Sequence, residues 1–201
     1  MGQIKVDYNL GGIEGLCLIT PQKHEDARGY FMETYHAIDM KEAGFDYDFV
    51  QDNQTRSTKG VLRGLHYQIH HPQAKLIRVL RGEIFDVVVD LRQGSETYGK
   101  WYGRCLTADQ GQQFLIPRGF AHGFLVLSDI AEMFYKCDAF YHPEDESGIA
   151  WNDPDLGIQW PQVCGEYAGS ADARGYRLAD GTPLILSEKD TKWKGLFAEK
   201  R

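Results

Sequence analysis

The sequence lacks long apolar runs, since no stretch approaches the roughly 18 consecutive apolar residues that a membrane-spanning helix needs, so we expect no membrane association. The first ten residues include Lys5 and Asp7 and lack an apolar core, so no secretory signal is expected. None of the four cysteines forms a CxxC pair, which predicts neither a zinc site nor a redox motif. Together these absences predict a cytoplasmic protein with free thiols.

Basic residues are too few for a nucleic-acid-binding surface. The 201 residues include 22 Lys and Arg against 29 Asp and Glu, which gives a formal net charge of −7. An acidic surface repels a phosphate backbone, so we expect no nucleic-acid partner. A local cationic pocket for one small anion remains compatible with this charge. The length and the 42% hydrophobic content are those of one ordinary globular domain.

Short strands separated by turns dominate the chain between residues 16 and 137. The segment 84–91 is the clearest, because its apolar side chains alternate with Asp86 and Asp90 on the opposite face. The other predicted strands are 30–34, 49–55, 62–68, 76–80, 99–106, 113–116, 120–127 and 132–137. About ten strands without intervening helices predict a mostly β sandwich or barrel rather than a doubly wound α/β sheet.

Two short helices and one long loop complete the predicted organisation. One helix spans about 37–43 and stops at Gly44, and the other begins after Ser187, which can cap it. Residues 161–183 are rich in Gly, Ala and Asp, which predicts a surface loop. The loop separates a β core from a C-terminal tail without marking a convincing domain boundary. We therefore expect a single domain over residues 1–201.

A candidate catalytic histidine, His66, lies in the segment Val-Leu-Arg-Gly-Leu-His-Tyr-Gln at 61–68. Histidine titrates near neutral pH and therefore suits proton abstraction. In a regular strand Arg63 and His66 face opposite sides, unless Gly64 marks a bulge that re-aims one of them. The alternative interpretation is a hydrogen-bonded structural histidine.

A second histidine, His122, follows Pro117 and Gly119 in the spacing PxGxxHG, which is typical of cupin barrels. In metal-binding cupins this histidine is a ligand, and a preceding HxH motif with a glutamate supplies the others. That HxH motif is absent here. The adjacent His70 and His71 would face opposite sides of a strand and could not ligate one ion together. We therefore expect no metal.

Several cations and tyrosines in the strand-rich region have both a structural and a functional interpretation. Arg28, Arg63 and Lys75 are either solvated edge charges or a pocket for an anion such as a diphosphate. Tyr135 and Tyr141 are either packing residues or proton donors.

Asp190 is a further candidate, and it follows Ser187 with the spacing of a capping box. This spacing indicates a residue at the start of a helix. The functional alternative is an aspartate that orients a catalytic histidine, fixing its tautomer and stabilising the imidazolium. The sequence leaves open whether Asp190 reaches His66.

Six segments in a fixed order span nearly the whole chain. They are 26–33 (Asp-Ala-Arg-Gly-Tyr-Phe-Met-Glu), 49–53 (Phe-Val-Gln-Asp-Asn), 60–68 (Gly followed by the segment at 61–68), 82–87 (Gly-Glu-Ile-Phe-Asp-Val), 116–124 (Ile-Pro-Arg-Gly-Phe-Ala-His-Gly-Phe) and 148–154 (Gly-Ile-Ala-Trp-Asn-Asp-Pro). Taken together they resemble the dTDP-4-dehydrorhamnose 3,5-epimerase family. The resemblance implies a cupin fold, which is a jelly-roll double-sheet β-barrel with a few short helices. It also implies a homodimer that uses no metal or cofactor.

The resemblance implies a role for each matching residue. His66 matches the general base and Tyr135 the general acid. Lys75 matches the lysine at the C4 oxygen of the substrate, and Asp190 matches the aspartate that pairs with the base. The matching substrate and nucleotide contacts are Arg28, Glu33, Gln51, Asn53, Arg63, His122, Glu146 and Lys189, and Tyr141 matches an aromatic residue beside the sugar.

The activity that the resemblance implies is the conversion of dTDP-4-dehydro-6-deoxy-D-glucose to dTDP-4-dehydro-L-rhamnose in dTDP-L-rhamnose biosynthesis. The 4-keto group acidifies the protons on C3 and C5, and a cation near O4 stabilises the enolate that forms. The expected partner is therefore a small dTDP-sugar. The alternatives are a 3-epimerase, a 5-epimerase or a ketoisomerase for a related sugar. From other classes, they are a metal-dependent cupin enzyme and a non-catalytic nucleotide-sugar binding module.

One segment departs from the family pattern. Residues 162–185 separate Pro161 from Leu186, where the family has a short link. Lengthening a surface loop costs little, about 0.6 kcal/mol for each doubling. We expect an extra surface loop followed by a short helical tail, and the sequence leaves open whether the loop covers the site or contacts a partner.

Overall fold

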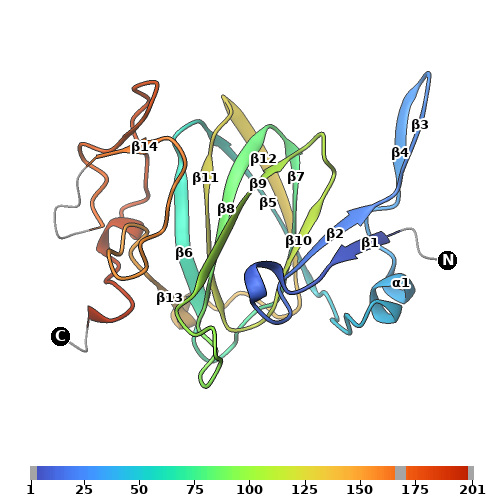
Figure 1. Cartoon of the computed structure of the whole chain (residues 1–201), viewed down its shortest axis with the longest axis horizontal. Helices are drawn as coiled ribbons and strands as arrows, with labels where there is room; N and C mark the ends of the chain where they lie inside the picture. The colour runs from blue at the N-terminus through green and yellow to red at the C-terminus, as the bar shows by residue number, and fades with distance from the viewer. Residues whose placement is uncertain (1–3, 166–170, 199–201) are drawn as a thin grey trace.

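The computed structural model describes residues 4–165 and 171–198, and it is built around two antiparallel sheets that form a barrel (Figure 1). The six-stranded sheet has the order β1 (Ile4–Asp7), β2 (Cys17–Pro21), β10 (Gln113–Ile116), β7 (Lys75–Arg81), β12 (Ile130–Cys137) and β5 (Gln51–Thr58). The five-stranded sheet has the order β13 (Glu146–Gly148), β6 (Leu62–Gln68), β11 (Phe120–Val126), β8 (Glu83–Asp90) and β9 (Trp101–Thr107). The prediction of a mostly β double-sheet barrel is confirmed.

The remaining elements are small. β3 (Lys23–Asp26) and β4 (Gly29–Met32) form a hairpin that projects from the barrel, and β14 (Val163–Cys164) pairs with β15 (Arg177–Leu178) (Figure 1). The helix α1 (Ala37–Glu42) ends near the predicted Gly44, and three 3₁₀ turns occupy Leu10–Gly12, Pro143–Asp145 and Asp190–Lys192. The helix expected after Ser187 is thus a single turn. Within the described ranges, no helix has the length and apolar character needed to cross a membrane.

The core forms three layers because each sheet buries side chains on both faces. Between the sheets, Ile77 of β7 packs in one cluster with Val88 of β8 and Phe124 of β11. On the outer face of the six-stranded sheet, Leu76 and Met40 share a second cluster. The outer face of the five-stranded sheet forms the third, which includes Val87, Val89, Trp151 and Trp160.

The alternation along β8 places Asp86 inside the barrel. Val87 and Val89 face the outer cluster, while Ile84 and Val88 belong to the cluster between the sheets. Because side chains alternate along a strand, Asp86 shares the inner face with Ile84 and Val88, where its side chain is wholly buried. A carboxylate that the sequence places on a polar face thus lies inside the barrel.

The segment 162–185 is only partly the surface loop that the sequence predicts. It contributes buried side chains to the outer cluster, namely Ala171, Ala173, Tyr176, Leu178 and Leu184. Trp151 Nε1 donates a hydrogen bond to the carbonyl oxygen of Ala171 at 2.8 Å, and the rings of Trp151 and Tyr176 meet edge to face at 4.9 Å. The outer face of the sheet is apolar, so these scattered apolar side chains are drawn out of water against it.

This packing predicts that the segment stabilises the fold. Leu178 is 1% exposed, so Leu178→Ala should lower the free energy of unfolding by about 2–5 kcal/mol. Arg177→Ala is the matched control, because Arg177 is exposed and its loss should change that free energy by less than about 0.5 kcal/mol. Urea denaturation of both variants measures the difference, and two equally small effects would contradict a packed segment.

Candidate active site

A cavity of about 750 Å³ lies between the two sheets, within the range that holds a small molecule. Apolar side chains such as Val61, Phe120, Phe124 and Met133 form part of its wall. All the site residues predicted from the sequence line it except Arg28 and Glu33, namely Gln51, Asn53, Arg63, His66, Lys75, His122, Tyr135, Tyr141, Glu146, Lys189 and Asp190. The fold therefore gathers side chains from six strands, the loop that carries Tyr141 and the C-terminal tail into one place.

A β-bulge in β6 brings Arg63 and His66 to the same cavity. The register pairs His66 with His122 and Arg63 with Phe124, so β6 holds one residue more than β11 between these pairs. Gly64 lies in this stretch with φ of 123°, and a Cβ there would be 2.5 Å from the Cα of Gly123. The bulge that the sequence offered as one alternative is therefore present, and it depends on a close approach of two glycines.

His66 is hydrogen-bonded to Asp190, with 2.5 Å between Nε2 and Oδ1. Asp190 is 2% exposed, and it also accepts a hydrogen bond from Trp193 Nε1 at 3.3 Å. Burial raises the pKa of Asp190, but the hydrogen bonds from His66, Ser187 and Trp193 outweigh it and hold that pKa below its ordinary value. Asp190 is therefore an anion that can orient His66 and stabilise its protonated form.

The C-terminal tail reaches His66 by pairing with the start of β6. Leu62 N donates to the carbonyl oxygen of Ile185, and Ile185 N donates to that of Gly60, both at 2.9 Å. Asp190 N then donates to Ser187 Oγ at 3.2 Å, which is the contact expected of a capping serine, although the residue at the N-cap of the 3₁₀ turn is Lys189. The two interpretations of Asp190 are thus both realised, since it begins a helical turn and contacts the histidine.

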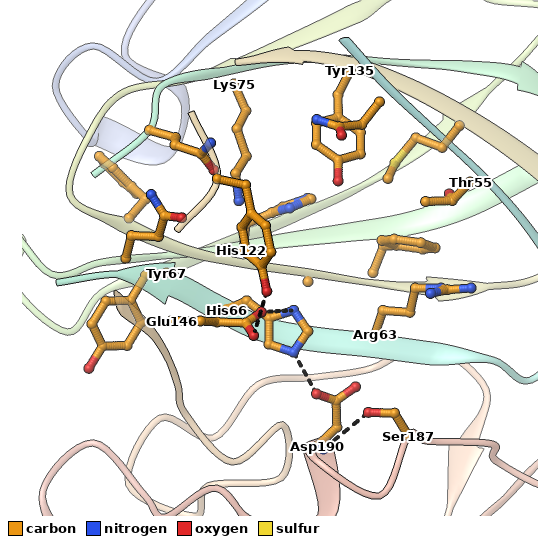
Figure 2. Close-up of a pocket in the computed structure, with 18 of the residues that line it drawn as sticks. Thr55, Arg63, His66, Tyr67, Lys75, His122, Tyr135, Glu146, Ser187 and Asp190 are labelled. Atoms are coloured by element: carbon orange, nitrogen blue, oxygen red, sulfur yellow. Dashed lines mark hydrogen bonds and ion pairs between the residues drawn. The ribbon is translucent and has the colours of Figure 1, made fainter. Parts of the chain in front are cut away.

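Glu146 lies on the other side of the His66 ring, and Figure 2 shows the two carboxylates flanking it. Glu146 Oε1 is 3.9 Å from His66 Nδ1. Lys189 Nζ contacts both oxygens of Glu146 at 2.8 and 2.7 Å, and the Tyr141 hydroxyl donates to Glu146 Oε2 at 3.0 Å. Burial raises the pKa of Glu146, but these contacts prevail and lower it. Glu146 thus remains charged beside the cavity-facing nitrogen of His66.

Lys75 and Tyr135 occupy the wall opposite His66 (Figure 2). Both come from the six-stranded sheet, whereas His66 comes from the five-stranded sheet. Burial lowers the pKa of Lys75, and no described residue forms a hydrogen bond or ion pair with its ammonium group. Burial raises the pKa of Tyr135 to about 12, so its phenol keeps its proton at neutral pH.

His122 has a carboxylate partner that the sequence interpretation missed. Its Nε2 lies 2.9 and 3.0 Å from the two oxygens of Asp86, whose side chain is wholly buried. The sequence carries one signal for it, because Asp86 is a charged residue within the otherwise apolar run 84–89. A charge in such a run is stable only with a polar partner, and the partner is a histidine on the neighbouring strand.

Two further sets of polar contacts hold side chains that line the cavity. Gln51 donates to Asn53 Oδ1 at 3.0 Å and accepts from the backbone N–H of Tyr141 at 2.9 Å. The guanidinium of Arg63 donates to Ser57 Oγ at 3.2 and 3.1 Å. These side chains present amide and cationic groups to the cavity from β5 and β6.

Arg28 and Glu33 lie outside this cavity. Arg28 is at the tip of the β3–β4 hairpin, where it forms an ion pair with Asp26. Glu33 lies near His36 and Asp39, and their ligand atoms are close enough together to hold a metal ion. The His36 ring already caps α1, where it accepts a hydrogen bond from the N–H of Asp39. The structure thus does not bring these two predicted contacts to the other site residues of the same chain.

The arrangement has the groups required for inversion of a carbon acid. One wall holds an imidazole that a carboxylate orients, and the facing wall holds a protonated phenol and an ammonium group. A base and an acid on opposite walls can remove a proton from one face of a ring and return one to the other. The fold and the site together fit an epimerase built on a double-sheet barrel.

Comparison with known proteins gives the family. The family model for dTDP-4-dehydrorhamnose 3,5-epimerase matches residues 11–198. A relative of that name from Methanothermobacter thermautotrophicus is 50% identical over 184 residues, which cover 92% of this chain and 91% of the relative. The chain therefore belongs to the dTDP-4-dehydrorhamnose 3,5-epimerase family, whose members are isomerases.

Solved structures agree with this assignment. The crystal structure of a dTDP-6-deoxy-D-glucose-3,5-epimerase from Legionella pneumophila, in complex with dTDP-4-keto-L-rhamnose, is 44% identical with a TM-score of 0.83. The match covers 97% of this chain and 94% of that one. A 3'-monoepimerase from Streptomyces bikiniensis, in complex with dTDP-quinovose, is 32% identical with a TM-score of 0.78, and the match covers 94% of this chain and 87% of that one.

The close approach at Gly64 leads to a test of the bulge. Gly64 and Gly29 share φ of 123°, but only Gly64 has backbone within reach of an added Cβ. Gly64→Ala should therefore lower the free energy of unfolding by about 1–3 kcal/mol more than Gly29→Ala, because it also creates a clash. Urea denaturation measures both, and equal losses would show that the glycine contact is not what fixes the bulge.

Proposed function

We propose that this chain converts dTDP-4-dehydro-6-deoxy-D-glucose to dTDP-4-dehydro-L-rhamnose by epimerisation at C3 and C5, as a step of dTDP-L-rhamnose biosynthesis. The observation that supports this most directly is the placement of His66 and Tyr135 on opposite walls of one cavity. An enzyme that inverts a centre needs a base and an acid on opposite faces of its substrate.

His66 is the proposed base. Asp190 holds its Nε2, which leaves Nδ1 to take a proton from the carbon next to the 4-keto group. The electrons of the broken C–H bond pass into the ketone and place negative charge on O4. Lys75 is the proposed partner of that oxygen, because its ammonium has no described ion-pair partner and lines the same cavity.

Tyr135 is the proposed acid. Its phenol donates a proton to the opposite face of the same carbon, the enolate collapses to the ketone, and the configuration is inverted. His66 then carries a proton and Tyr135 has lost one, so both exchange with water before the second centre reacts. No oxidation state changes, so the scheme uses no redox cofactor.

The nucleotide end of the substrate is assigned to the mouth of the cavity. Arg63 and Lys189 are the proposed cations for the diphosphate, where an arginine can bind two oxygens at once. Gln51 and Asn53 offer amide groups to the pyrimidine, and Tyr141 offers an aromatic ring beside the sugar. Glu146 and His122 complete the proposed substrate contacts.

A homodimer is part of the proposal. Arg28 and Glu33 lie outside the cavity of their own chain, and the hairpin that carries Arg28 projects away from the barrel (Figure 1). A contribution of these two residues to substrate binding therefore requires a second copy, whose cavity would receive the hairpin. The cytoplasmic location stays a prediction.

A second candidate activity is epimerisation at one carbon only. The similarity to a 3'-monoepimerase favours this candidate, because one fold can serve either outcome. The two activities differ in which carbons exchange protons with water. Proton NMR of the product formed in deuterium oxide separates them, since label at both C3 and C5 is the result expected of the double epimerase.

The role of His66 predicts the result of one substitution. His66→Asn removes the base but keeps a polar side chain, so deuterium should no longer enter C3 or C5 from heavy water, and turnover should fall by at least about 10²–10⁴-fold. His70→Asn is a matched control, because His70 is a mostly exposed histidine outside the cavity lining and should keep full exchange. Wild-type exchange in His66→Asn would remove this residue from the base role.

The role of Tyr135 predicts a different outcome. In Tyr135→Phe the enolate still forms, because His66 and Lys75 are intact, but it can be reprotonated only from the His66 face. Deuterium should therefore enter the substrate while the configuration is retained. NMR of the recovered sugar reports both quantities, and unchanged inversion in this variant would show that another group is the acid.

A further inference from the structure

The cavity contains a second imidazole–carboxylate pair beside the first. His122 and His66 are cross-strand partners on β11 and β6, and both line the cavity. His66 Nε2 contacts Asp190, and His122 Nε2 contacts both oxygens of Asp86 at 2.9 and 3.0 Å. The proton transfers assigned to His66 and Tyr135 give Asp86 no part, although it is a wholly buried charge in the barrel.

The charged groups near the two histidines differ. The exposed fraction of the His66 side chain is 25%, and Glu146 lies 3.9 Å from its Nδ1. The His122 side chain is 9% exposed, and the charges that face it are Asp86 from β8, Lys75 from β7 and His66 from β6. Burial lowers the pKa of His122, and Lys75 and His66 lower it further against the effect of Asp86. The surroundings of His122 therefore favour its neutral form.

A neutral imidazole carries one donor and one acceptor nitrogen, and an ionised carboxylate can only accept. Because Nε2 of His122 faces Asp86, this nitrogen holds the hydrogen and Nδ1 holds the lone pair. Within the described ranges no residue forms a hydrogen bond with His122 Nδ1. This atom is also not fully buried. It is thus a solvent-accessible acceptor on a residue that lines the cavity.

We propose that Asp86 is a positioning residue that fixes His122 in the Nε2-protonated tautomer, so that His122 Nδ1 accepts a hydrogen bond from a hydroxyl group of the bound sugar. The inference rests on the proposed function, since the 4-keto-6-deoxy sugar offers hydroxyls at C2 and C3. Asp86 takes no part in proton transfer. It acts by making His122 an acceptor that favours a sugar with a hydroxyl at that position over one without it.

The tautomer can be measured without any activity assay. Nitrogen-15 NMR of histidine-labelled protein should show His122 with Nε2 protonated and Nδ1 unprotonated at pH 8. In Asp86→Asn the amide can donate or accept, so a mixture of tautomers should appear. Asp90→Asn is the control for a lost carboxylate on the same strand, because Asp90 binds Arg92, Ser95 and Thr97 and should leave His122 unchanged. If Asp86→Asn does not fold, the wild-type spectrum still decides, since an Nδ1-protonated His122 overturns the proposal.

Kinetics supply the second readout. Asp86→Asn should lower kcat/KM by about 10–100-fold, the range for loss of a hydrogen bond to a charged group. It should also reduce the ratio of kcat/KM for the full substrate to kcat/KM for its 2-deoxy or 3-deoxy analogue. Proton exchange at C5 is the assay that serves all of these sugars. The inference about Asp86 is overturned if Asp86→Asn keeps the wild-type tautomer of His122 and the wild-type preference for the full substrate over its deoxy analogue. Absence of exchange in the wild-type enzyme would instead overturn the proposed function, so the two failures are distinguishable.

Discussion

The hydrogen bond between His66 and Asp190 is the interaction on which the rest of the site depends. It joins a barrel strand to a tail 124 residues further along the chain. Asp190 is 2% exposed, and a buried carboxylate is stable only with partners that satisfy its charge. The pairing of Ile185 with the start of β6 and the packing of the segment 162–185 bring the tail into place. The packing of this segment on the outer face of the five-stranded sheet thus helps to place Asp190 against His66.

The double-sheet architecture accounts for the stereochemistry of the proposed reaction. In the proposed complex, the sugar ring lies between the two sheets, with one face toward β6 and β11 and the other toward β7 and β12. The same histidine side chain has different electrostatic surroundings at two neighbouring positions, with Glu146 beside His66 and Lys75 near His122. The different roles proposed for these two residues therefore rest on the charges around them rather than on the residue type.

Much of the barrel was predictable because strands such as 62–68 and 113–116 alternate or are strongly apolar, and both have the predicted bounds. β1 was missed because Ile4 and Val6 alternate with charged residues over only four positions, whereas the equally short β10 is apolar at Phe114, Leu115 and Ile116. The motifs located most of the cavity, and Gly64 correctly indicated a bulge. Contacts distant in sequence, such as Asp86 with His122 and Trp151 with Ala171, leave no local pattern, so the structure was needed to show them.

The most direct test of the central claim is a crystal structure of the protein with an unreactive analogue of the dTDP-keto-sugar. We expect His66 Nδ1 to face C3 and C5 from one side of the pyranose ring and the Tyr135 hydroxyl to face them from the other, with Lys75 Nζ within hydrogen-bond distance of O4. A sugar bound with both His66 and Tyr135 on the same face, or with its diphosphate between them, would contradict the account.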